Sequence, residues 1–144
     1  MRSFLTVASM TMALISGSGL VQAQNILITE AEAQTPSLQV PTTRAITRGP
    51  GINLLTPSEV LAKSFTLKLV FEPRGGAKID ASSIKFEYLK QPIIDLTTRF
   101  RPGLSGNQLE LAMVTVPPGK HPIRVSVRDS EGREGHTVIH LSAK

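Results

Sequence analysis

The sequence predicts an all-β domain, an antiparallel sandwich of about seven strands. The first observation is that apolar and polar residues alternate along 65–71, as they do in a strand with one buried face. The second is that turn residues such as Pro73-Arg74-Gly75-Gly76 separate the alternating segments at the spacing of a sandwich or barrel. The third is that no window shows the apolar period of a helix.

Each expected strand is a short apolar or alternating segment between turn signals. The expected strands cover residues 52–55, 65–71, 84–88, 93–97, 109–116, 123–128 and 137–141. Their alternation assigns a set of side chains to the inside of the sandwich. These core candidates are Phe65, Leu67, Leu69, Phe71, Ile84, Phe86, Tyr88, Leu96, Leu109, Leu111, Met113, Val116, Ile123, Val125, Val127, Ile139 and Leu141.

The last two expected strands form a hairpin whose register can be predicted. If Asp129 pairs with Arg133, glycine occupies the left-handed position of a three-residue loop, at Gly132. This register places Val125 opposite Thr137, and it places the neighbouring apolar pair on the same face. A slip of one residue would turn a charged side chain into the core, so the pattern enforces the register.

A longer run supports a more specific fold. The run from Val116 to Arg133, in which a Pro-Pro-Gly corner precedes alternating valines, an aspartate and a glycine turn, resembles the penultimate strand of bacterial immunoglobulin-like and cadherin-like extracellular domains. Ile79 to Ile84 is similar to the approach to a middle strand in those domains. The resemblance implies an immunoglobulin-like sandwich over residues 51–144. It identifies a corner and a hairpin and not a site, and this chain carries a single copy of a domain that often occurs in tandem.

Ahead of the domain, residues 1–23 have the pattern of a cleaved signal peptide. Arg2 precedes an apolar stretch from Phe4 to Ile15, and Val21-Gln22-Ala23 offers the small residues that a signal peptidase reads. The apolar stretch is shorter than the roughly 20 residues that a membrane-spanning helix needs. We therefore expect no membrane span and an exported protein, periplasmic or secreted.

Residues 24–50 are expected to form a flexible spacer. Three prolines and many threonine and glutamine residues interrupt this stretch, and its apolar residues have no sustained period. Such a segment buries too little apolar surface to offset the entropy of ordering it. The alternative is that Ile26–Ile28 pairs as an edge strand.

Composition limits the possible partners. The formal net charge of +5 is spread along the chain, and an exported protein seldom meets nucleic acid, so a protein or an anionic envelope component is the expected partner. There is no cysteine, which excludes a disulfide, a thiol nucleophile and a lipid-modified cysteine at the cleavage site. The domain is expected to be a monomer or a weak oligomer.

Metal binding is the alternative function that the sequence leaves open. His121, His136 and His140 could bind a transition metal, as in copper-resistance-type sandwiches. However, His121 has the opposite strand parity, and His136 and His140 lie about 13 Å apart along a strand. Four acidic residues could instead bind calcium, although they lack the Asp-x-Asp spacing of calcium loops. These residues are Asp80, Asp95, Asp129 and Glu131. We expect no cofactor and no metal site. We interpret Asp80 and Asp129 as turn residues.

The sequence contains no catalytic pattern. It lacks the Gly-x-Ser-x-Gly turn of a serine hydrolase and a glycine-rich phosphate loop. With no tryptophan and one tyrosine, it offers no aromatic platform for sugars. We therefore expect that the protein is not an enzyme. We expect a non-enzymatic binding or structural module that makes protein–protein contacts.

One exposed turn is the best candidate for recognition. Arg99 and Arg101 flank Phe100 ahead of a Pro-Gly pair, and arginine and aromatic residues are enriched at interfaces. The alternative is an ordinary turn in which the two arginines face water and Phe100 covers the core.

Overall fold

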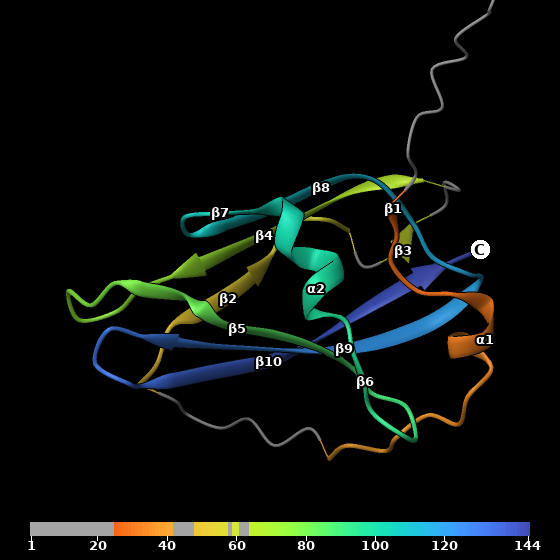
Figure 1. Ribbon diagram of the computed structural model, residues 1–144, viewed down its shortest axis with the longest axis horizontal. Coiled ribbons are helices and arrows are strands. Elements are labelled where there is room, and N and C mark those ends of the chain that lie inside the picture. The colour runs from red at the N-terminus through yellow and green to blue at the C-terminus, as the bar shows by residue number, and fades with distance from the viewer. Residues whose placement is uncertain (1–24, 42–47, 58, 61–63) are drawn as a thin grey trace, which may run out of the picture.

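The structure, a computed structural model, describes residues 25–41, 48–57, 59–60 and 64–144. The predicted signal peptide at 1–23, like residues 42–47 of the predicted spacer, lies outside these residues. The described chain forms two β-sheets packed face to face, with two short helices at the side and at one end (Figure 1). The predicted all-β sandwich is confirmed.

The first sheet has the order β1-β8-β4-β2, with β7 paired to part of β8. Its strands are β1 (Asn25–Ile26), β8 (Gln108–Thr115), β4 (Phe65–Glu72), β2 (Gly51–Leu54) and β7 (Leu104–Ser105). The pairs β8–β4, β4–β2 and β7–β8 are antiparallel, whereas β1 runs parallel to β8.

The second sheet has the order β3-β10-β9-β5-β6. Its strands are β3 (Glu59–Val60), β10 (Glu134–Ala143), β9 (Gly119–Asp129), β5 (Ile79–Tyr88) and β6 (Ile94–Asp95). Only the short β3 pairs in parallel among these strands, with the end of β10. In the immunoglobulin convention, β2, β4, β8 and β7 occupy the A, B, E and D positions, and β5, β9 and β10 occupy C, F and G.

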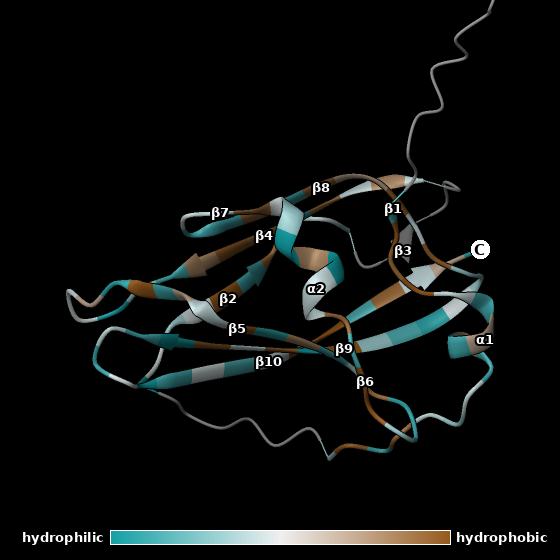
Figure 2. Cartoon of the chain, viewed as in Figure 1, coloured by the Kyte–Doolittle hydropathy of each residue, from teal (hydrophilic) through white to brown (hydrophobic). Residues whose placement is uncertain are grey.

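Figure 2 shows apolar and polar bands alternating along the long strands. The apolar residues of β4, β5, β9 and β10 point between the sheets, as the alternation predicts. The fully buried side chains from these strands include Leu67, Leu69, Phe71, Phe86, Tyr88, Ile123, Val125, Val127 and Leu141. A single core therefore holds the two layers together.

Met113 is wrongly predicted as a core residue. It is 40% exposed, and Val114 is buried instead. The pairing of β4 with β8 shifts here: Phe65 pairs with Val114 and Leu67 pairs with Leu111, so one residue of β4 opposes two of β8. This β-bulge reverses the alternation, because the extra residue turns the following side chains to the other face.

The hairpin between β9 and β10 confirms the predicted register. Val125 pairs with Thr137, and Asp129 N–H donates to the carbonyl of Arg133 at 3.0 Å. Gly132 has a φ of 78°, the left-handed value that a three-residue loop requires. Turn chemistry and core face thus select the same pairing.

The segment expected as the fourth strand, 93–97, is only partly a strand. β6 covers Ile94–Asp95, and the chain then forms α2 (Thr97–Phe100) and the 3₁₀ turn η1 (Arg101–Gly103). A helix of a single turn is too short to show an apolar period, so this element has no sequence signal of the kind used above.

Residues 25–41 are not a free spacer. They contribute β1 and the one-turn helix α1 (Glu30–Ala33), and Leu27 and Ile28 between them are buried in the core. Further along, Leu38 N–H donates to the carbonyl of Leu89 at 3.0 Å. The alternative of an edge strand near Ile26–Ile28 is therefore closer to the observed structure, and the prediction of a flexible spacer is wrong for this part of the chain.

Candidate functional site

The predicted interaction surface is not formed as one patch. Phe100 is fully buried, and its ring stacks on that of Phe86 with the centroids 4.0 Å apart and the planes nearly parallel. Arg99 turns back onto the N-terminal segment, and only Arg101 of the three is exposed to solvent. Phe100 thus covers the core, as the alternative interpretation expects, while Arg99 has a structural partner.

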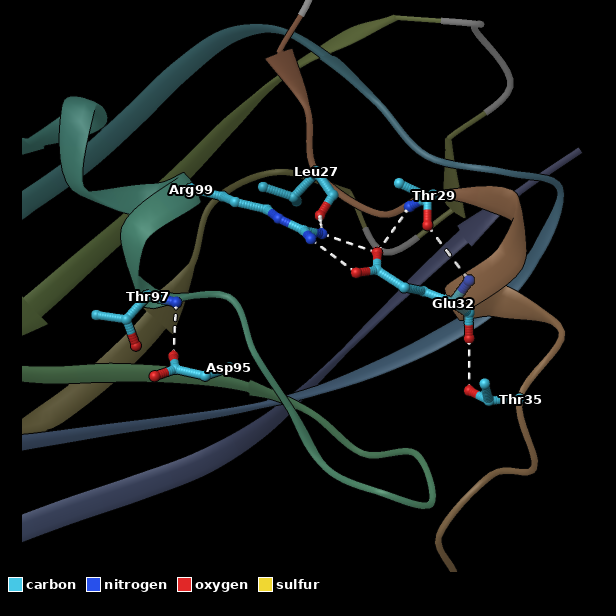
Figure 3. A network of polar contacts seen from close by, with 7 residues as sticks. All are labelled: Leu27, Thr29, Glu32, Thr35, Asp95, Thr97 and Arg99. Carbon is cyan, nitrogen blue, oxygen red and sulfur yellow. Dashed lines mark hydrogen bonds and ion pairs between the residues drawn. The ribbon is translucent and has the colours of Figure 1, made fainter.

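That partner is Glu32 of α1 (Figure 3). The two guanidinium nitrogens of Arg99 donate to the two carboxylate oxygens of Glu32 at 2.7 and 2.8 Å, and one of them also donates to the carbonyl of Leu27 at 2.9 Å. Glu32 accepts a further bond from Thr29 N–H at 2.9 Å, which completes a capping box at the start of α1. The contact joins two elements that are 67 residues apart in sequence.

The electrostatics of this contact favour the charged forms. Hydrogen bonds from Arg99 hold the pKa of Glu32 at about 2, against its ordinary value of 4.5, although partial burial acts in the opposite direction. The same bonds raise the pKa of Arg99. The pair therefore stays ionised across the physiological range and fastens α1 to α2.

A buried lysine makes a second connection to the N-terminal segment. Lys90 is only 5% exposed, and its ammonium donates to the carbonyls of Ala33 and Thr35 and to the hydroxyl of Ser37 at 3.0–3.1 Å. All three of its donors are thereby used. Lys90 is satisfied inside the fold and offers nothing to a ligand.

His121 is likewise occupied by the fold. Its Nε2 lies 2.6 Å from the carbonyl of Pro117, which can only accept, so this nitrogen carries the proton and Nδ1 accepts from the Tyr88 hydroxyl at 2.8 Å. Burial lowers the pKa of His121 and raises that of Tyr88 to about 12. Both groups are neutral in this arrangement, and His121 lies opposite Leu141, as its strand parity predicts.

The candidate metal ligands are not brought together. His136 and His140 are exposed on the outer side of β10, away from the buried His121. Among the residues that the structure describes, no group of three or more His, Cys, Asp or Glu side chains could hold a metal ion.

The predicted turn roles of the aspartates are confirmed where the structure tests them. Asp80 accepts from Ser82 N–H at 3.1 Å, which is an Asx turn. The buried Asp129 accepts from the N–H groups of Glu131 and Arg133, each at 3.0 Å. Burial opposes ionisation of this carboxylate, but these donors and the Arg133 guanidinium, which donates at 2.8 Å, outweigh it and lower its pKa.

The outer face of the second sheet carries the candidate site. We define this outer face by the outward side chains of β5, β9 and β10 that line a shallow depression of about 480 Å³. They are Ser83, Lys85, Glu87, Arg124, Ser126, Arg128, Glu134 and His136. Ion pairs form at both ends: Arg124 with Glu87, at 2.8 Å from Nε, and Arg128 with Glu134, at 3.4 Å.

Between the two ion pairs lies a row of three donors. Lys85 pairs with Ser126 across β5 and β9, and Ser126 pairs with His136 across β9 and β10. Lys85 and Ser126 belong to no motif in the sequence, and His136 stands out there only as a possible metal ligand. The hairpin register would have placed Ser126 beside His136, because outward residues of paired strands share a face.

No protein-family model matches this sequence, and no curated protein matches it. Among solved structures, the chain is similar to a superoxide reductase (neelaredoxin) from Ignicoccus hospitalis, with 11% sequence identity and a TM-score of 0.41. That match covers 67% of this chain and 83% of the other. No helix in the described part of the chain is long and apolar enough to cross a membrane.

Proposed function

We propose that this protein is a non-enzymatic, exported binding module that contacts a protein partner through the outer face. The observation that carries the proposal is the depression on β5, β9 and β10, which is lined by charged and hydroxyl side chains, including three donors without a partner in the described fold. Surfaces on which charged side chains alternate in sign fix how a partner protein aligns and orients at the interface. The protein core contributes the rigid sheet on which these side chains are held.

Export is supported by the amino-terminal sequence. The apolar stretch from Phe4 to Ile15 followed by Val21-Gln22-Ala23 is typical of a signal peptide, and cleavage after Ala23 would leave Gln24 as the first residue. The mature protein would act in the periplasm or outside the cell. A fold that carries no cysteine is compatible with that oxidising environment.

We further propose kinship with the bacterial immunoglobulin-like and cadherin-like exported domains. Two features support this: the Pro-Pro-Gly corner at 117–119 that leads into β9, and the assignment of the strands to the A-B-E-D and C-F-G positions. Domains of this architecture commonly serve as binding or spacer modules, although the fold alone does not determine a function.

Site-specific photo-crosslinking in the exporting cell tests the partner surface. A photoreactive amino acid replaces Val138, which lies on the outer side of β10 opposite Arg124. The matched control replaces Thr66, an exposed residue of β4 on the other sheet. We expect a discrete covalent adduct with one protein at position 138 and none at position 66, with the partner identified by mass spectrometry.

Two results would contradict the proposal. An adduct at position 66 alone, or at neither position, would exclude the outer face as the contact. An uncleaved chain in the membrane fraction, measured from its amino-terminal peptide, would exclude release after export.

A further inference from the structure

Lys85, Ser126 and His136, which we call the donor row, point outward from three neighbouring strands at one level of the sheet. The pairings Lys85–Ser126 and Ser126–His136 place them in line. Neighbouring strands lie about 4.8 Å apart, so the backbones of Lys85 and His136 are separated by about 10 Å, with Ser126 midway. Two longer side chains thus flank a short one, which leaves room above the serine hydroxyl.

The three polar groups of the donor row are not used by the fold. Within the described residues, no hydrogen bond or ion pair joins any of them to another side chain or to the backbone, whereas both arginines of the outer face are paired with glutamates. The positive charge of Lys85 is felt by Asp95, but that carboxylate accepts from Thr97 N–H at 2.9 Å. The donor row therefore has unused capacity for a ligand.

The chemistry of the donor row selects a carboxylate. An ammonium, a hydroxyl and an imidazole can together donate to the two oxygens of one carboxylate. Lys85 supplies a full positive charge to the row, and Glu87 and Glu134 lie on either side of it. Those two carboxylates oppose a doubly charged ligand such as phosphate more strongly than a singly charged one.

We propose that the donor row binds a carboxylate of an acidic segment in the partner protein. This proposal rests on the proposed function, because it names the group that the outer face recognises. The flanking ion pairs, Arg124–Glu87 and Arg128–Glu134, lie on the two sides of the donor row. Recognition is electrostatic, so it weakens as the salt concentration rises.

A titration of the labelled full mature protein with a capped hexaglutamate peptide tests the donor row. We expect saturable NMR shifts of the His136 imidazole and the Ser126 amide, and none with a capped hexaglutamine peptide. Lys85→Gln and His136→Gln should each weaken binding about two- to fivefold, as an exposed charge interaction does. The matched controls, Lys68→Gln on β4 and His140→Gln further along β10, should leave binding unchanged.

Further ligands identify other sources of negative charge. Tighter binding of inorganic phosphate, of vesicles that contain anionic lipid, or of an anionic polysaccharide would overturn the carboxylate proposal. Equal affinity of the wild type and the Lys85→Gln variant would overturn it as well. If the adduct at position 138 forms in the wild type but hexaglutamate binds the wild type and the Lys85→Gln variant equally, the proposed function holds and the donor row fails. If hexaglutamate binds but no adduct forms at position 138, the donor row binds a carboxylate and the proposed contact with a protein partner fails.

Discussion

At the scale of single residues, Met113 has an unusual backbone. Its φ is 55°, the left-handed region in which a side chain meets the following carbonyl. It is the only non-glycine residue with positive φ among those that the structure describes. The bulge in β8 imposes this conformation, because one residue of β4 opposes two of β8 at this point.

The strain at Met113 predicts that glycine at this position is more stable than alanine, the inverse of the usual order. In most positions glycine is less stable than alanine, by about 0.5–1 kcal/mol, because it loses more backbone entropy. Here the left-handed φ costs alanine about 1–2 kcal/mol, and glycine avoids that cost. Met113→Gly should therefore be more stable than Met113→Ala by about 0.5–1 kcal/mol in urea unfolding. The opposite order would show that the bulge relaxes when the methionine side chain is removed.

Glu32 predicts a pH dependence of stability. Its pKa is held near 2 in the folded protein by Arg99, below its ordinary value of 4.5. The unfolded chain thus takes up the proton first, so the stabilisation is complete above about pH 4.5 and declines as the pH falls toward 2. Unfolding free energies of the wild type and Glu32→Gln should differ by about 1–3 kcal/mol at pH 7 and converge at low pH.

A pH-independent difference between these two proteins would contradict that role for the charge. Arg99→Gln serves as the matched control, because it removes the other partner of the same pair. The double variant should cost less than the sum of the two single variants, since the residues are in direct contact.

At the scale of elements, the N-terminal segment, residues 25–41, functions as part of the sandwich. It is held by Arg99 from α2, by Lys90 two residues after the end of β5, and by its own apolar pair. The two cations bind its backbone and its single helical turn, while Leu27 and Ile28 fill the space at the edge of the core. A one-turn helix gains little stability alone, so these tertiary contacts are what order it.

The buried pair of this segment predicts a large loss on truncation. Leu27→Ala and Ile28→Ala should each lower the unfolding free energy by about 2–5 kcal/mol, because both side chains are fully enclosed by the core. The matched control is Ile26→Ala in the same segment, since that side chain is 59% exposed. It should change stability by less than about 0.5 kcal/mol. Equal effects at positions 26, 27 and 28 would mean that the segment does not dock as described.

At the scale of the whole molecule, local patterns predicted most of the sandwich. The alternation in β4, β5, β9 and β10 identifies their inner faces, and turn residues fix the β9–β10 register. Those features depend on neighbours in the sequence, so a single sequence can reveal them. The resemblance of the corner and the hairpin to immunoglobulin-like domains had implied a sandwich.

The remaining features depend on distant contacts or on irregular pairing. Leu27 and Ile28 are buried in a core whose strands come later in the chain, and the Leu27 carbonyl accepts from Arg99, 72 residues away. The bulge between Phe65 and Leu67 reverses which side chains of β8 point inward, and no turn residue in the sequence indicates it. The donor row depends on a second irregularity, between Asp80 and Lys85, which sets the level of Lys85 beside Ser126. Alternation alone predicts the face of that lysine and not its neighbours.

The closure of the two sheets depends on a close backbone approach at one edge. Where the chain enters β2, Pro50 passes directly over Gly135 at the start of β10. A Cβ atom at Gly135 would lie 2.1 Å from the carbonyl oxygen of Pro50, which is backbone and cannot rotate away. The two layers meet here without a side chain between them, so this contact sets their spacing at the edge.

Gly135→Ala should therefore lower the unfolding free energy by about 2–3 kcal/mol, the cost of forcing packed backbone apart. Gly51→Ala is the matched control, because it changes the same residue type one position after Pro50. The atoms nearest to its Cβ atom would be side-chain atoms of Arg74 and Glu72, at 3.4–3.5 Å, which requires little adjustment. That variant should stay within about 0.5 kcal/mol of the wild type. Chemical denaturation of both proteins measures the contrast, and similar losses in the two would show that the sheets do not close at the Pro50–Gly135 contact.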